Sequence, residues 1–168
     1  MEQLIKSTYK RWQEAKKYAS RRCRKALPEL ARQLDNCTMF TGEETLPELI
    51  SLMFEPQGRE FILANHFPSL NLFRRFKQFN PEQYGVFIDS GNITLNDPGK
   101  IYLVGQINAE IYCQQTQANN IILMHGAKAK IYASGYSVVK AENDRKSEIQ
   151  ITASPTAKVL WTTPGDSS

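Results

Sequence analysis

Two histidines and three cysteines are the side chains of this sequence best suited to catalysis or metal binding. Neither His66 nor His125 has a Cys or Asp at the spacing that a zinc site needs. His125 precedes Gly126, which indicates a turn, and a turn histidine acts as a base only beside a nucleophile or carboxylate. A twenty-residue repeat, described below, places Gly105 next to it instead. We therefore expect no catalytic residue, no metal and no cofactor.

Motifs for phosphate binding and nucleophilic catalysis are missing as well. The sequence contains no G-x-x-x-x-G-K-[ST], no G-x-G-x-x-G and no G-x-S-x-G. Asp89 and Asp97 lie beside Gly and Pro, which favours turn residues over a pair of catalytic carboxylates. Acyltransferases built on hexapeptide β-helices need a six-residue repeat, which this chain lacks.

The cysteines indicate free thiols. Cys23, Cys37 and Cys113 are odd in number and widely spaced, which suits a reducing compartment better than a disulfide framework. The N-terminus has no apolar run typical of a signal peptide, and no stretch of about 18 apolar residues predicts a membrane span. These features predict a cytoplasmic protein.

The positive charge is concentrated at the start of the chain. Residues 1–33 hold ten Lys or Arg against three Glu, a net charge of +7, while residues 34–168 have a net charge of −3. Apolar side chains in residues 2–25 recur at steps of three and four, which predicts a helix with an apolar stripe. The cations that fall mostly off this stripe are the candidate contacts for nucleic acid or a protein partner: Lys6, Lys10, Arg11, Lys16, Lys17, Arg21, Arg22, Arg24 and Lys25.

Three interpretations of this basic helix remain open. The cations could neutralise phosphates of a nucleic acid, with Arg74-Arg75 adding to them. Alternatively, Tyr9 and Trp12 could enter a membrane surface, although the Ala-rich stripe makes nucleic acid the better candidate. In the simplest interpretation, the stripe docks on the protein's own core or on a partner and the cations are solvated.

Further helices are predicted up to residue 80. Pro28–Leu34 forms a short one, and Thr45 with Glu48 forms a capping box that opens a helix ending before Pro56-Gln57-Gly58. Two more follow, near residues 60–65 and over residues 69–78, and Asn80-Pro81 marks the boundary of the helical region.

After this boundary, one pattern occurs three times at a step of twenty. Small or aliphatic residues alternate with mostly polar ones, which is the period of half-buried strands. A constant step indicates stacked rungs, a rung being one circuit of the chain around a solenoid axis. The repeated apolar positions are Ile107, Ala109, Ile111, Cys113; Ala127, Ala129, Ile131, Ala133; and Ser147, Ile149, Ile151, Ala153.

We therefore predict an α+β protein. Four or five helices in residues 1–80 cap a short right-handed β-helix of three to four rungs in residues 81–163, and residues 164–168 form a disordered tail. One strand layer per rung is expected, and the first rung fits less well, with Ile93 aligned to Ile111 at a step of eighteen. Trp161, Pro155 and Pro164 could blunt the last rung. The alternative is an antiparallel β-sandwich of short strands.

The stacked pattern resembles the bactofilins, bacterial proteins built on a small right-handed β-helix that polymerises end to end. The segments that carry the resemblance are Asn108-Ala109-Glu110-Ile111 and Ala129-Lys130-Ile131, within residues 86–161. The resemblance implies a bacterial protein of β-helical architecture, and it assigns no functional residue.

These observations favour a non-enzymatic interaction or scaffolding protein that self-associates or binds a partner through its β-solenoid. The alternative is a nucleic-acid-associated protein that binds phosphates through the basic helix. An enzyme using His125 or His66 in a cleft between the helices and the β-helix is the third hypothesis.

Overall fold

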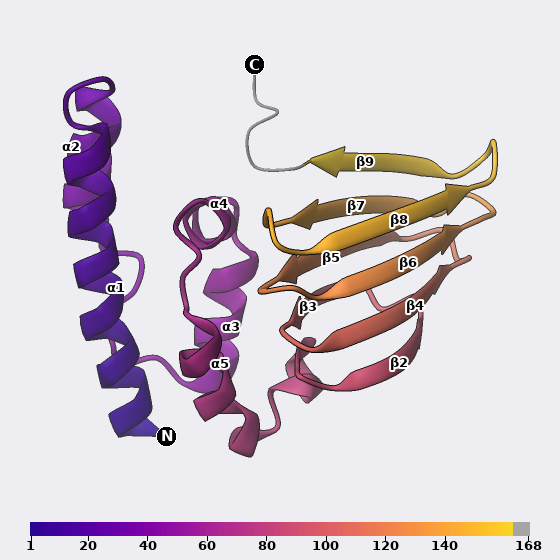
Figure 1. The fold of residues 1–168 in the computed structure, drawn as a ribbon, viewed down its shortest axis with the longest axis horizontal. Coiled ribbons are helices and arrows are strands. Elements are labelled where there is room, and N and C mark those ends of the chain that lie inside the picture. The colour runs from indigo at the N-terminus through magenta and orange to yellow at the C-terminus, as the bar shows by residue number, and fades with distance from the viewer. Residues whose placement is uncertain (163–168) are drawn as a thin grey trace. The chain divides into compact units, whose positions relative to one another are not determined.

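The computed structural model describes residues 1–162 and divides the chain into two compact units (Figure 1). A helical unit comprises residues 1–75, and a solenoid unit begins at Phe76. This division lies a few residues before the expected boundary at 80/81. The predicted tail 164–168 lies outside the described residues.

Five α-helices build the helical unit: α1 (Glu2–Cys23), α2 (Pro28–Asn36), α3 (Leu46–Phe54), α4 (Pro56–Asn65) and α5 (Leu70–Phe76). The predicted helices are confirmed, with one correction. The chain is interrupted before Pro56-Gln57-Gly58 as expected, since α3 ends at Phe54, but these three residues form the first turn of α4 instead of separating the two helices. Proline suits this position, where its missing N–H has no partner to lose. The predicted helix 69–78 ends as a short 3₁₀ helix over Lys77–Phe79.

The capping box at the start of α3 is confirmed. The Thr45 N–H and hydroxyl both donate to Oε2 of Glu48, at 2.8 and 2.7 Å. These bonds hold the pKa of Glu48 below its ordinary value. Local polar chemistry therefore defines where α3 begins.

Aromatic side chains form the centre of the helical unit. The Trp12 ring of α1 lies 5.7 Å from the Phe40 ring and 6.4 Å from the Phe61 ring of α4, both edge-on. Tyr9 meets Phe40 at 5.5 Å. Edge-to-face contacts of this kind add about 1 kcal/mol each to the burial of the rings, so the apolar stripe of α1 is part of this core.

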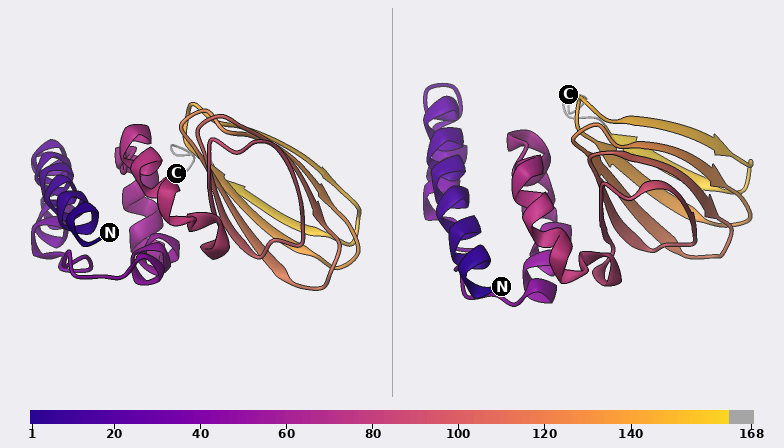
Figure 2. Two further views of the ribbon diagram at one scale, coloured as in Figure 1. Left: turned by 90° about the horizontal axis from the view of Figure 1, so that it is seen from below. Right: turned by 60° about the horizontal axis from the view of Figure 1, so that its bottom comes forward.

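The solenoid unit is a parallel β-solenoid of about four turns (Figure 2). Each rung contributes two strands, one to each of two sheets, so the expected single strand layer per rung is wrong. The five-stranded sheet has the order β1-β3-β5-β7-β9, and the four-stranded sheet has the order β2-β4-β6-β8. The strands are β1 (Val86–Ile88), β2 (Gly91–Asn96), β3 (Lys100–Val104), β4 (Ile107–Cys113), β5 (Ala118–Met124), β6 (Lys128–Ala133), β7 (Val138–Asn143), β8 (Glu148–Ala153) and β9 (Lys158–Thr162). Every strand pair is parallel, which rules out the antiparallel sandwich.

The step of twenty is the register of the solenoid from its second rung onward. Ile111 pairs with Ile131, and Ile131 pairs with Ile151. In the other sheet Ile101 pairs with Ile121 at the same step. The outward Tyr112 and Tyr132 rings stack with centroids 5.1 Å apart. Alternate inward side chains thus form continuous apolar columns.

The first rung departs from this step. Ile93 pairs with Ala109, and Leu95 pairs with Ile111, a step of sixteen rather than the predicted eighteen. Val86 likewise pairs with Tyr102. The first rung is shorter because its strands and corners contain fewer residues than the strands and corners of the later rungs. The twenty-residue repeat of the later rungs does not predict this shorter length.

Candidate interaction surfaces

The nine predicted contact cations do not form one surface. Four of them are engaged within the helical unit. Lys6 pairs with Glu2, and Arg24 pairs with Asp35 at 2.7 Å. The Arg22 guanidinium lies 5.7 Å from the centre of the Tyr18 ring, and Lys16 binds backbone carbonyls. These four therefore have structural partners already.

The other five cations of this set are solvent-exposed and make no ion pair with any residue in the described part of the chain: Lys10, Arg11, Lys17, Arg21 and Lys25. At about 100° per residue, Lys10, Lys17 and Arg21 fall within about 40° of one another around α1. They lie opposite the buried Trp12 side of the helix. This stripe, Lys10–Lys17–Arg21, is the part of the predicted contact set that lies in one line on the exposed face of α1.

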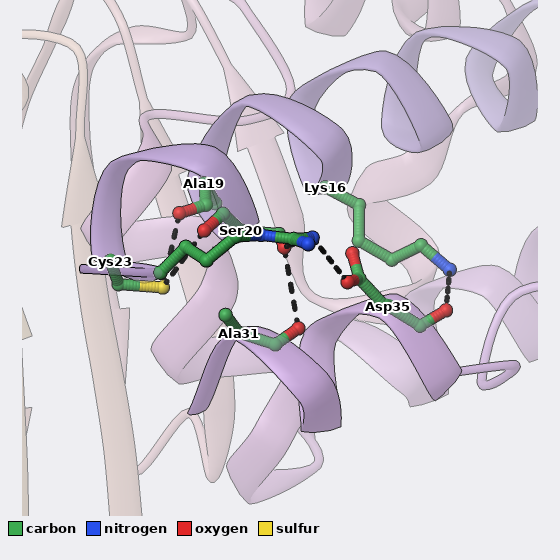
Figure 3. Close-up of polar contacts among 7 residues, drawn as sticks. Lys16, Ala19, Ser20, Cys23, Ala31 and Asp35 are labelled. Atoms are coloured by element: carbon green, nitrogen blue, oxygen red, sulfur yellow. Dashed lines mark hydrogen bonds and ion pairs between the residues drawn. The ribbon is translucent and has the colours of Figure 1, made fainter. Parts of the chain in front are cut away.

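Polar contacts fasten α1 to α2 (Figure 3). The Ser20 hydroxyl donates to the Ala31 carbonyl at 3.3 Å, and Arg24 reaches the Asp35 carboxylate. Lys16 donates to the Asp35 carbonyl at 3.4 Å and to the Cys37 carbonyl at 2.7 Å. The cations on this side of α1 hold the helix hairpin together.

The membrane-surface interpretation of α1 does not fit the structure. Trp12 is buried and Tyr9 is half-buried, and both pack against Phe40. An apolar stripe that is used in the core is not available to lipid. No helix in residues 1–162 is long and apolar enough to cross a membrane.

His125 lies at a corner between β5 and β6, as expected. Its backbone has a positive φ of 58°, and its N–H donates to Oδ2 of Asp144 at 2.9 Å. Oδ1 of Asp144 accepts from the Ser147 hydroxyl at 2.7 Å and from the Lys146 N–H at 3.1 Å. The Ser147 oxygen in turn accepts from the Gly126 N–H at 3.1 Å.

This Asp144–Ser147 network was not found from the sequence. Burial raises the pKa of the Asp144 carboxyl, but hydrogen bonds from His125, Ser147 and Lys146, together with the His125 charge, leave the pKa lowered. A signal existed, since Asn143-Asp144 follows the corner at His125 by about one step of the repeat. The Asp144 carboxylate accepts from the Ser147 hydroxyl and from the His125 and Lys146 N–H groups, so the network joins two successive corners of the solenoid.

Asp89 and Asp97 also lie at corners, with φ of 46° and 44°. Oδ1 of Asp97 accepts from the Gln114 and Gln115 N–H groups of the next rung, and Oδ1 of Asp89 accepts from the Gln106 N–H. They are turn residues, as predicted. His66 is a left-handed residue that ends α4. No group of three or more His, Cys, Asp or Glu in residues 1–162 could hold a metal ion.

The two ends of the solenoid differ. At the first rung, residues 77–85 pack against β1: Lys77 Nζ donates to the Asp89 carbonyl at 3.1 Å, and the Ser90 hydroxyl donates to Glu82 at 2.9 Å. The Tyr102 N–H donates to the Gly85 carbonyl. The segment that leads into the solenoid therefore covers β1, while Ile93 and Leu95 on β2 are only half-buried.

The last rung exposes apolar side chains. Leu160 and Trp161 on β9 are 52% and 51% exposed, and Ile151 on β8 is half-buried. Pro155 lies in the corner between these strands and so removes no donor from either of them, contrary to the blunting role predicted for it. Pro164 lies outside the described residues. The Trp161 indole donates to Oδ1 of Asn143 at 3.0 Å, which fixes the ring over the edge of β7.

Comparison with protein-family models, with curated proteins and with solved structures found no match for this chain. The parallel β-solenoid of about four turns is consistent with the resemblance to bactofilins in architecture alone.

Proposed function

We propose that this chain is a non-enzymatic interaction protein that self-associates through the last rung of its solenoid. The observation that carries the proposal is the half-exposed Leu160 and Trp161 pair on β9. In the described residues, β9 pairs with β7 on one side and β8 pairs with β6 on one side. An edge strand with exposed apolar side chains is a template for strand pairing with another chain.

A second copy is the occupant that fits this end. The columns that finish at Trp161 and Ile151 are apolar and need another apolar layer above them. The same end of a second copy, related by a two-fold axis across the solenoid axis, supplies such a layer. β9 then pairs antiparallel with β9 of the partner, and β8 with β8, in an isologous contact.

Stacking in the opposite sense, last rung on first rung, is disfavoured. Residues 77–85 cover the β1 edge, and the first rung repeats at sixteen residues where the last repeats at twenty. The β1 edge is therefore not available to pair with β9 of another copy. We therefore propose a closed dimer rather than a filament.

Light scattering after size exclusion tests this proposal. The full chain is expected as a dimer across a range of concentrations, and Leu160→Lys/Trp161→Asp is expected to weaken dimerisation at least tenfold. Tyr136→Lys is the matched control, because Tyr136 is 69% exposed but lies at a corner and not at the end of the solenoid. A strictly monomeric wild type, a longer polymer, or equal loss in the Tyr136 variant would contradict the proposal.

A second candidate function is binding of nucleic acid by the stripe Lys10–Lys17–Arg21. The specific observation is that these cations are exposed and unpaired among the described residues, and they span about 16 Å along α1. Each phosphate contact releases a counterion, so binding should weaken as salt rises.

Titration of duplex DNA at several salt concentrations tests the second candidate. Replacing the three stripe residues by Glu is expected to abolish binding at low salt. The charge-matched control replaces Lys100, Lys130 and Lys146, which are exposed on the solenoid unit, by Glu. If both triple variants lose binding equally, or the wild type does not bind, the stripe is not a nucleic-acid site.

A further inference from the structure

A groove in the helical unit is independent of both proposed functions. It is a cavity of about 530 Å³ between the α1–α2 hairpin and α4, a volume in the usual range for small-molecule sites. Its walls include Trp12, Leu34 and Phe61, and the Trp12–Phe61 contact closes one side. Every lining residue belongs to the helical unit.

The Lys16 ammonium in this groove lacks a compensating negative charge. It is half-buried, and two of its donors bind the neutral carbonyls of Cys37 and Asp35, while the Trp12 ring centre lies 4.7 Å away. The Asp35 carboxylate is paired with Arg24 instead. In the described residues Lys16 makes no ion pair, and a half-buried cation without a counter-charge is unfavourable.

The charged residues lining the groove favour an anion. Besides Lys16 they are Arg22 and Glu60, both exposed, which leaves a net charge of +1 on the lining. The remaining walls are mainly apolar or aromatic. A ligand that satisfies both features has one acidic head group and an apolar body.

We infer that this groove binds an amphipathic anion, such as a long-chain carboxylate. The head group pairs with the remaining donor of Lys16. The apolar body lies along Trp12, Leu34 and Phe61. Bound ligand also covers Cys23 and Cys37, which line the same groove.

Calorimetric titration of the full chain with dodecanoate, kept below its micelle-forming concentration, tests the inference. Dodecanol is the matched neutral probe. Lys16→Gln is expected to weaken dodecanoate binding at least tenfold while dodecanol binding changes little, and Lys16→Arg should restore much of the loss. Lys17→Gln, next to it on the exposed side of α1, should bind both probes like the wild type.

Two further measurements keep the inference falsifiable if Lys16→Gln loosens the α1–α2 hairpin. Ala64→Trp, which fills the groove from α4, should abolish binding of both probes. Dodecanoate should also slow alkylation of Cys23 and Cys37 in the wild type. No binding of dodecanoate, equal binding by wild type and Lys16→Gln, or binding of anionic vesicles without binding of monomeric dodecanoate would overturn it.

Discussion

Trp161 pairs with Ala141 in the register of the five-stranded sheet, yet Ala141 is completely buried and Trp161 is half exposed. The column that begins with Ile101 and Ile121 is thus covered at each rung except the last. The difference arises because each rung is buried by the next one, and no described residue follows β9. The same relationship leads to the proposed dimer.

The position of a residue in its column should determine how much it stabilises the solenoid. Ile131 is fully buried between Ile111 and Ile151, so Ile131→Ala should lower the free energy of unfolding by about 2–5 kcal/mol. Ile151→Ala should cost roughly half as much, because Ile151 is only half-buried. Urea denaturation in the Leu160→Lys/Trp161→Asp background, where the proposed dimer is weakened, measures both costs, and an equal cost there would contradict the half-buried position of Ile151.

The Asp144 carboxylate should make stability depend on pH. Its pKa is lowered in the folded protein, so the ionised form is stabilising above the ordinary pKa of the unfolded chain. That contribution is lost as the pH falls through the folded-state pKa. Asp144→Asn should lower the free energy of unfolding by about 1–3 kcal/mol at neutral pH.

The test for Asp144 is chemical denaturation from neutral pH to below the ordinary Asp value. The difference between wild type and Asp144→Asn should shrink as the pH falls. Arg145→Gln is the control, because Arg145 is the exposed neighbour in the same corner. A constant difference at every pH would mean that the ionised carboxylate is not what stabilises the corner.

The three cysteines should fall into two reactivity classes. Cys113 is completely buried, and burial raises the pKa of its thiol to about 11, while Cys23 and Cys37 are half-buried. Because the thiolate is the reactive form, Cys113 should be unreactive in the native protein at pH 8. Titration with a disulfide reagent should modify two thiols quickly and the third only in denaturant. Three fast thiols would contradict the buried column.

Two glycines of the first rung should respond differently to substitution. Gly85 and Gly91 both have a positive φ, but a Cβ on Gly85 would lie 2.4 Å from the Lys100 carbonyl oxygen, whereas a Cβ on Gly91 meets no atom within 4 Å. Gly91→Ala should cost about 1–2 kcal/mol through its backbone conformation alone. Gly85→Ala should cost clearly more in thermal unfolding. Equal costs would mean that the segment before β1 can move aside.

The sequence predicts the twenty-residue repeat because three rungs require apolar residues at the same inward positions. Inward positions such as Ala109, Ala129 and Ile149 must be apolar and must recur at one step, so periodicity alone predicts their columns. The first rung has no second example of its step, so its register of sixteen could not be read from spacing. The α3 capping box was readable because it depends on residues within one turn of helix.

The sequence alone therefore determined the helical and solenoid units, the columns from Ile107 onward, and the surplus of cations on α1. Tertiary structure decided which cations are free. Arg24 pairs with the Asp35 carboxylate and Lys16 donates to the Asp35 carbonyl because α2 returns alongside α1, whereas Lys10, Lys17 and Arg21 make no ion pair with any residue from 1 to 162. It also decided that Trp161 is exposed. The physical reason is the same for both: a side chain's partners come from residues distant in sequence, whose positions no local pattern specifies.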